Sequence, residues 1–284
     1  MKIVKKLMMG ALLSASSVMS AHAIPINMGG GVYVDPDYFQ SLNAHDFIGQ
    51  FNFTQWYTLG NQATTDKLST TNLTHAAVVA SGVSQNGNGA ATGYFLQGAG
   101  TFYRVNEPSR SIAAGFGLPG SFCPGCQLTF AFGGIELNNN FSFNYANAWG
   151  AIYVDRTSEA PYSVPSSSNP ATYQADLDAH TDGEPWLRFK FNALGFAPNS
   201  TPSVVQGSVA ADLEVIGGIA APYFNPKFVS YTADANFGAS EFSAYGNGRI
   251  TGNTVPEPTS LAMLGLGLLG LAAGRRKKSF AVTA

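Results

Sequence analysis

Two cysteines three residues apart, Cys123 and Cys126, form the run Cys-Pro-Gly-Cys. Outside the cytoplasm such a pair is normally oxidised. The spacing also occurs in thioredoxin-type redox motifs, but those need a βαβ pattern and a helix after the second cysteine. Here the next residues, from Leu128 to Phe132, alternate as in a strand. We predict a structural disulfide across the Pro-Gly turn; the alternatives are redox chemistry and a zinc site, which would need two more ligands.

The densest group of acidic side chains lies between residues 176 and 184. Asp176, Asp178 and Asp182 stand at spacings that partly resemble a calcium-binding loop. His180 within the run is a poor ligand for a hard cation, and Phe189 stands where a closing bidentate Glu would be needed. We interpret the run as a solvated acidic loop, with a calcium site on the three aspartates as the alternative.

Residue pairs that could support hydrolysis are few. Asp35 and Asp37 could act as paired carboxylates on a glycoside, but two residues of separation in a proline-containing loop rarely place them across a sugar. The histidines His45, His75 and His180 are not near a nucleophile-elbow motif. We therefore predict no catalytic residues and no cofactor, and expect a protein that is not an enzyme.

The three tryptophans lie in strand-like runs. Trp186 shares its strand parity with Arg188 and Lys190, opposite to the apolar residues. On a solvent-facing side it could stack on a sugar ring, which would make the protein a carbohydrate-binding module. The alternative is that the tryptophans pack beneath a loop or against a second sheet.

The composition limits the classes of partner. Charged residues make up 11% of the chain and hydrophobic residues 45%. An ordinary domain has about 25% charged residues. Since no basic patch remains once the two termini are set aside, we exclude nucleic acid as a partner.

Alternating apolar and polar residues run through the body of the chain. One example is the stretch with Phe47, Phe51 and Phe53 on one parity, and others are 141–145, 187–191 and 209–215. A period of two indicates a strand with one buried face, and Gly, Asn and Pro clusters separate the runs. The sequence predicts an all-β fold, an antiparallel β-sandwich or jelly-roll-like domain, with no long amphipathic helix before Thr259.

The first 23 residues have the order of a secretory signal peptide. Three lysines precede a short apolar run, and Ala21 and Ala23 form an A-x-A cleavage site. We expect the mature chain to begin at Ile24, with a secreted β-rich domain over residues 24–250. A linker from Thr251 to Val255 would connect it to the C-terminal segment, so that residues 251–284 form a separate unit.

The C-terminal segment contains three parts in order. Val255, Pro256, Glu257 and Pro258 come first, and the prolines hold the chain extended. Residues 259–274 are apolar and, as a helix, reach roughly 24 Å, which snorkelling cations can extend across a bilayer. The block Arg275, Arg276, Lys277 and Lys278 follows and would stay cytoplasmic. This pattern predicts a single C-terminal transmembrane helix.

Pro-Glu-Pro, an apolar helix and a basic end together resemble the PEP-CTERM sorting signal. A plain membrane anchor is the alternative. Together with the N-terminal signal peptide, which predicts export by the Sec route, the resemblance implies a Gram-negative bacterium, transient anchoring in the inner membrane and processing by an exosortase. It further implies release to the cell surface or to an exopolysaccharide matrix.

The body of the chain is similar to the flocculation-associated PEP-CTERM proteins. The similarity rests on four segments in order, which are residues 34–37, 94–102, 149–155 and 221–224. That family is associated with retention of exopolysaccharide and with aggregation of cells into flocs or biofilm, and it offers no catalytic residues. Our leading hypothesis is a matrix protein associated with exopolysaccharide; the alternatives are a carbohydrate-binding module and a secreted hydrolase.

Overall fold

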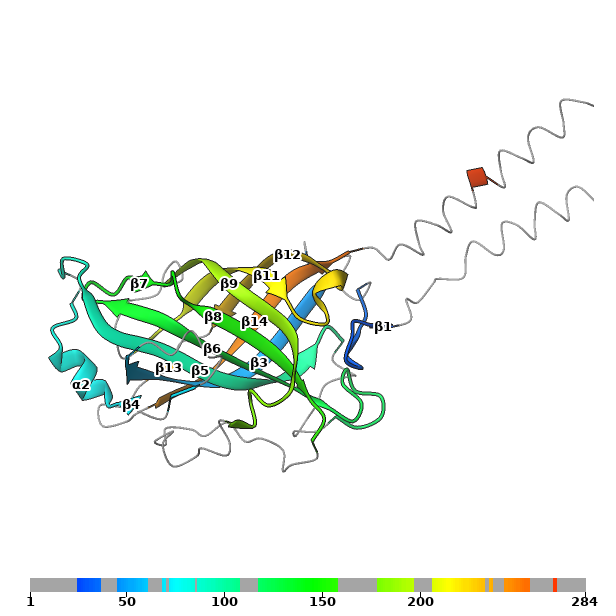
Figure 1. Ribbon diagram of the computed structural model, residues 1–284, viewed down its shortest axis with the longest axis horizontal. Coiled ribbons are helices and arrows are strands. Elements are labelled where there is room, and N and C mark those ends of the chain that lie inside the picture. Colours follow the sequence, from blue (N-terminus) through cyan, green and yellow to red (C-terminus); the bar gives the residue numbers. More distant parts are fainter. Residues whose placement is uncertain are drawn as a thin grey trace, which may run out of the picture.

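The computed structural model describes residues 25–36, 45–60, 68–69, 72–84, 86–107, 117–157, 178–196, 206–232, 235–236, 243–255 and 268–269. The described residues form an antiparallel β-barrel built from long strands (Figure 1). Its walls are β3 (Phe47–Leu59), β5 (Ala91–Val105), β6 (Gln127–Asn138), β8 (Trp149–Asp155), β9 (Glu184–Phe196), β11 (Val209–Gly217), β12 (Phe224–Thr232) and β14 (Ser243–Thr254).

The all-β prediction is confirmed, but the sandwich or jelly roll is wrong. Each wall strand pairs with its neighbours in the order β3-β5-β6-β8-β9-β11-β12-β14. The sheet then closes because β14 also pairs with β3, from Ser243 opposite Trp56 to Gly252 opposite Phe47. A single closed sheet leaves no edge among these strands, whereas a sandwich would have two sheets with edges.

Shorter elements complete the described fold, and its first two strands pair only with each other as a separate two-stranded sheet. The short strands are β1 (Ile26–Asn27), β2 (Tyr33–Val34), β4 (Asn72–Leu73), β7 (Phe143–Asn144), β10 (Gln206–Gly207) and β13 (Ala235–Asn236). Helix α2 (His75–Ala80) is capped by Thr74, whose side chain accepts a hydrogen bond from the Ala77 N–H. The 3-10 turn η3 (Ala221–Tyr223) precedes β12. Val78 of α2 is fully buried in the interior cluster, so this short helix packs against the barrel core.

The predicted alternation fills the barrel interior with aromatic rings. Phe51, Phe102 and Phe130 contact one another edge to face, with ring centroids 4.7 to 5.6 Å apart. Several rings lie across a glycine of the adjacent strand. A Cβ atom added to Gly100 would stand 2.6 Å from the Phe130 ring, and one added to Gly49 would stand 2.6 Å from the Phe102 ring. The inward glycines thus provide the room that the rings occupy.

A second, smaller cluster lies on the outer face of β3, β5, β6 and β8. Trp56, Trp149 and Tyr153 are its large members, and all three are buried. The Trp56 Nε1–H donates to the Ser69 carbonyl, 3.0 Å away, and Leu68 joins the cluster. These two tryptophans therefore pack beneath a chain segment, which is the alternative left open by the sequence. Burial raises the pKa of the Tyr153 phenol to about 12.

The C-terminal boundary of the barrel domain also differs from the prediction. The residues expected to be a linker, 251–254, form the last part of β14, and Thr251 pairs with both Val229 and Ile48. The described domain therefore extends to Thr254 rather than ending at residue 250. Polar residues such as Thr251 and Asn253 resemble a linker in sequence, but pairing on both sides fixes them as a strand.

Candidate functional site

The junction between the barrel and the C-terminal segment is held by one carboxylate. Asp46 accepts hydrogen bonds from the Thr254 N–H at 2.6 Å and from the Thr254 hydroxyl at 2.7 Å. The Asn253 side-chain oxygen accepts the Asp46 N–H at 3.3 Å, and the Val255 N–H donates to the Tyr223 carbonyl at 2.8 Å. The chain is thus fixed up to the residue that precedes Pro-Glu-Pro.

Asn106 joins this junction to the N-terminal part of the domain. Its side-chain amide donates to the carbonyls of Asp35 (2.7 Å) and Asp46 (2.6 Å), and its oxygen accepts the Ile48 N–H at 2.7 Å. Asn106 is buried and has a φ of 48°, a left-handed conformation that asparagine tolerates better than most residues. The sequence analysis did not identify Asn106 as a structural residue. Its sequence context, an Asn-Glu-Pro run directly after a long strand-like stretch, is the feature that could have indicated it.

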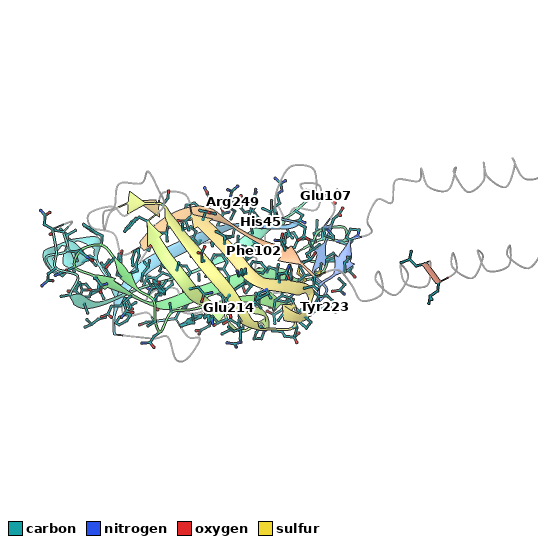
Figure 2. The ribbon with its side chains drawn as sticks, turned by 90° about the horizontal axis from the view of Figure 1, so that it is seen from above. His45, Phe102, Glu107, Glu214, Tyr223 and Arg249 are labelled. Atoms are coloured by element: carbon teal, nitrogen blue, oxygen red, sulfur yellow. A yellow bond between two sulfur atoms is a disulfide. The ribbon has the colours of Figure 1, made fainter. Side chains whose placement is uncertain are left out.

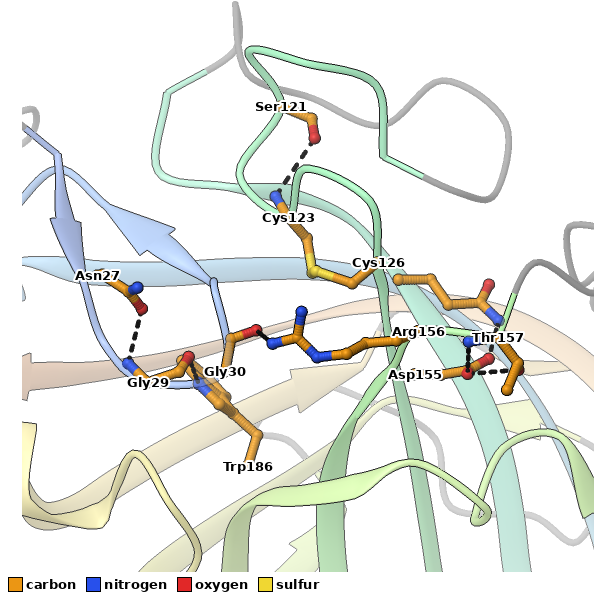
Figure 3. Close-up of a disulfide and its surroundings, with 11 residues drawn as sticks. Asn27, Gly29, Gly30, Ser121, Cys123, Cys126, Asp155, Arg156, Thr157 and Trp186 are labelled. Carbon is orange, nitrogen blue, oxygen red and sulfur yellow. Dashed lines mark hydrogen bonds between the residues drawn. A yellow bond between two sulfur atoms is a disulfide. The ribbon is translucent and has the colours of Figure 1, made fainter.

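The N-terminal hairpin of β1 and β2 closes the same end of the barrel (Figures 1 and 3). Met28, Val32 and Val34 are buried in the interior cluster. The Tyr33 N–H donates to the Phe122 carbonyl at 2.7 Å, which ties the hairpin to the loop that carries the cysteines. We call these hairpin and loop residues, 26–34 and 121–126, the plug.

The disulfide lies within this plug (Figure 3). Cys123 and Cys126 are bonded, with Cα atoms 5.2 Å apart, and both are fully buried. Gly125 takes a φ of 68° at the turn, and β6 begins directly after Cys126, so no helix follows the pair. The predicted disulfide is confirmed, and its burial beside the core fits a structural role rather than a redox motif.

Trp186 does not lie on the solvent-facing side, so the sugar-stacking interpretation is wrong and the alternative, a packed tryptophan, holds. The pairing of β8 with β9 shifts so that Ile152 faces Leu187 and Tyr153 faces Pro185, which leaves Trp186 as the extra residue of a β-bulge. The bulge turns the indole into the core, where it is fully buried 5.6 Å from the Phe224 ring. Its Nε1–H donates to the Gly29 carbonyl of the plug, 3.1 Å away.

The predicted calcium ligands are only partly described. Asp176 lies outside the described residues, as does Asp37 of the Asp35/Asp37 pair. Asp178 and Asp182 are exposed, on either side of the buried His180. Within the described ranges, no group of three or more His, Cys, Asp or Glu side chains is placed to hold a metal ion.

A polar groove crosses the outer face of β12, β14 and β3. Tyr231, Arg249 and Gln50 are successive cross-strand partners in one row. Tyr103, Thr232 and Asn247 complete the polar lining of a hollow of about 260 Å³. The Arg249 guanidinium lies 5.6 Å from the centre of the Tyr231 ring, and Tyr231 is 41% exposed. Figure 2 labels Arg249 at the edge of the barrel. We call these six residues the outer groove.

The outer groove offers the contacts that carbohydrates use. An exposed aromatic face packs on the C–H surface of a sugar ring, and amides bond to its hydroxyls. A guanidinium binds a carboxylate through two parallel hydrogen bonds. Single-sequence reasoning missed the site because its residues come from four strands that are distant in sequence.

Ala21, Ala23 and Ile24, and the tail residues Pro256, Glu257, Pro258 and Arg275 to Lys278, lie outside the described part of the chain. Val255 is described and is 41% exposed. The described residues contain no helix that is both long and apolar enough to cross a bilayer.

Residues 254–277 match the family model of the PEP-CTERM protein-sorting motif. The match confirms the resemblance of the C-terminal segment to this signal, and it indicates an exported surface protein that an exosortase processes. It begins at Thr254, the last residue of β14. No curated protein matches the chain, and no solved structure does either.

Proposed function

We propose that this chain is a non-enzymatic matrix protein of a Gram-negative bacterium. It is exported by the Sec route, held in the inner membrane by residues 259–274, processed by an exosortase and released to the surface or matrix. The observation that carries the proposal is the sorting motif at residues 254–277, which begins where the barrel ends. Cleavage after Val255 leaves every strand of the barrel intact, since the Asp46 contacts lie before the cut.

The matrix setting in this proposal is exopolysaccharide, with cell aggregation into flocs or biofilm as the outcome. The low charge of the chain supports it, because a surface of amides and hydroxyls contacts a hydrated polymer without long-range repulsion. The amide row on the outer face of β3 and β14 also supports it, with the half-buried Asn52 facing the exposed Asn247.

The delivery step is tested by removing the signal in the producing bacterium. Deleting residues 256–284 leaves Val255 and its contact with Tyr223, so the barrel should fold and stay in the periplasm. A matched control replaces only Pro256, Glu257 and Pro258 by alanine, which keeps the apolar segment and the basic end. We expect the control chain to stay unprocessed in the inner membrane. Surface delivery of both variants at the level of the natural chain would contradict the proposal.

The outer groove favours carbohydrate binding as a second function, acting through an acidic glycan. We expect the full chain to be retarded in affinity electrophoresis through alginate, a uronate polymer, more than through neutral dextran. Tyr231→Ala should reduce the retardation at least fivefold. Tyr245→Ala is the matched control, because Tyr245 is 45% exposed on the same strand face but does not line the groove. Equal effects of the two substitutions would rule the groove out as the binding site.

A further inference from the structure

The barrel contains an interior cavity that the proposed function does not use. It measures about 110 Å³, and residues from all eight wall strands line it. Ala211 and Leu213 contribute from β11, Phe189 and Phe191 from β9, and Phe53 from β3. The cavity therefore lies at the centre of the fold rather than in a surface crevice.

The cavity results from an uneven distribution of side-chain size. On β5, Gly98 and Gly100 are covered closely by the Phe132 and Phe130 rings, since added Cβ atoms would lie 2.6 Å from them. On β8, an added Cβ at Gly150 would have its nearest neighbour 3.7 Å away, in the Phe191 ring. The Phe130 and Phe132 rings thus lie close against β5, whereas the space beside Gly150 of β8 is left open.

The lining selects an apolar occupant. Among the described residues the polar lining side chains are Gln55, Ser230 and Thr232. Two of these already bond to the backbone, since the Ser230 hydroxyl donates to the Arg249 carbonyl and the Thr232 hydroxyl accepts the Val209 N–H. The remaining lining is phenyl, aliphatic or glycine surface, and apolar cavities of about 150 Å³ stay dry and bind benzene.

The cavity also has an approach from solvent. Phe191 and Leu194 line the cavity, yet both keep part of their surface exposed. Phe189, which comes earlier on the same strand, is buried. The barrel end near the plug is closed by Trp186 and the N-terminal hairpin. Entry therefore lies toward the end of β9 and the start of β11, where Val209 lines the cavity.

We infer that the barrel binds one small apolar molecule of about the size of a substituted benzene in this cavity. The eight-stranded wall encloses a volume of the right order for one small ligand. The surrounding Phe rings offer edge-to-face contacts to an aromatic guest. Gln55 is available to a single polar substituent at the rim of the lining.

Toluene is the probe, added to the full chain and observed by saturation-transfer NMR. We expect transfer to toluene with a dissociation constant below about 1 mM. Ala211→Leu fills the cavity from β11 and should weaken binding at least tenfold. Ala210→Leu is the matched control, because Ala210 lies on the opposite parity of the same strand, outside the lining.

Two results would overturn the inference. One is an absence of saturation transfer with the natural chain, and the other is equal binding by the Ala211→Leu and Ala210→Leu variants. If Ala211→Leu fails to fold, Val209→Phe at the entrance takes its place, with the same tenfold loss expected. Neither result bears on the outer groove, which toluene does not contact.

Discussion

Replacing Gly252 with alanine should destabilise the barrel through a single clash. An added Cβ would stand 2.5 Å from two atoms of the Phe228 ring, about 0.9 Å closer than an ordinary contact. The ring cannot move freely, because Phe47, Phe189 and Phe224 surround it with centroids 5.4 to 5.8 Å away. Overpacking a filled core costs about 1–3 kcal/mol, and we expect Gly252→Ala to lower the free energy of unfolding by about 2 kcal/mol.

Urea unfolding followed by tryptophan fluorescence measures this loss, since Trp186 lies in the same aromatic cluster. Gly195→Ala is the control. Nothing lies within 4 Å of its added Cβ, so reduced freedom of the unfolded chain should stabilise it by about 0.5 kcal/mol. In a Phe228→Leu background the clash partner is gone, and Gly252→Ala should cost less than about 0.5 kcal/mol. An unchanged cost in that background would refute the assignment of the clash to Phe228.

Three further predictions concern the tyrosine of the outer cluster, the strand junction and the plug. The Tyr153 pKa lies at about 12 in the fold against 10 in the unfolded chain, so the unfolded state loses its proton first and stability falls as pH rises from 10 to 12. Tyr153→Phe removes this titrating group and should reduce the alkaline loss, read from melting temperatures; part of the loss remains, because burial also raises the pKa of Tyr57. Because the buried Tyr153 hydroxyl has no hydrogen-bond partner in the described part of the chain, the substitution should also stabilise the fold by about 1 kcal/mol at pH 7. Asp46→Ala removes two hydrogen bonds to Thr254 and should lower the free energy of unfolding in urea by about 2 kcal/mol. The end of β14 should then be cleaved earlier in limited proteolysis. Unchanged proteolysis would show that Asp46 does not hold the end of this strand. Replacing Cys123 and Cys126 by serine removes the disulfide across a short loop and should lower the free energy of unfolding by about 2 kcal/mol. A reductant should leave the melting temperature of that variant unchanged.

Local pattern was enough to predict the strands and the disulfide. The parity of Phe47, Phe51 and Phe53 follows from alternation alone, and the structure buries all three. The Cys-Pro-Gly-Cys turn is likewise a local feature, since its two cysteines are three residues apart.

Closure of the barrel could not be predicted from short stretches of sequence, because it depends on pairing between strands that are far apart in the chain. The pairing of Ser243 with Trp56 joins strands almost two hundred residues apart, and a sandwich would show the same alternation in each strand. The error at Trp186 has a similar cause, because one bulge residue reverses the parity of everything before it in the strand. The outer groove could not be predicted for the same reason. Tyr231 and Gln50 lie in one row only because each is the cross-strand partner of Arg249 on β14.

The position of β14 determines how the domain responds to mechanical force. The chain leaves the barrel from the end of β14, which is bonded to β3 on one side and to β12 on the other. A pull along the tail loads this strand lengthwise between its two neighbours, so that many ladder hydrogen bonds are sheared at once instead of opening one by one.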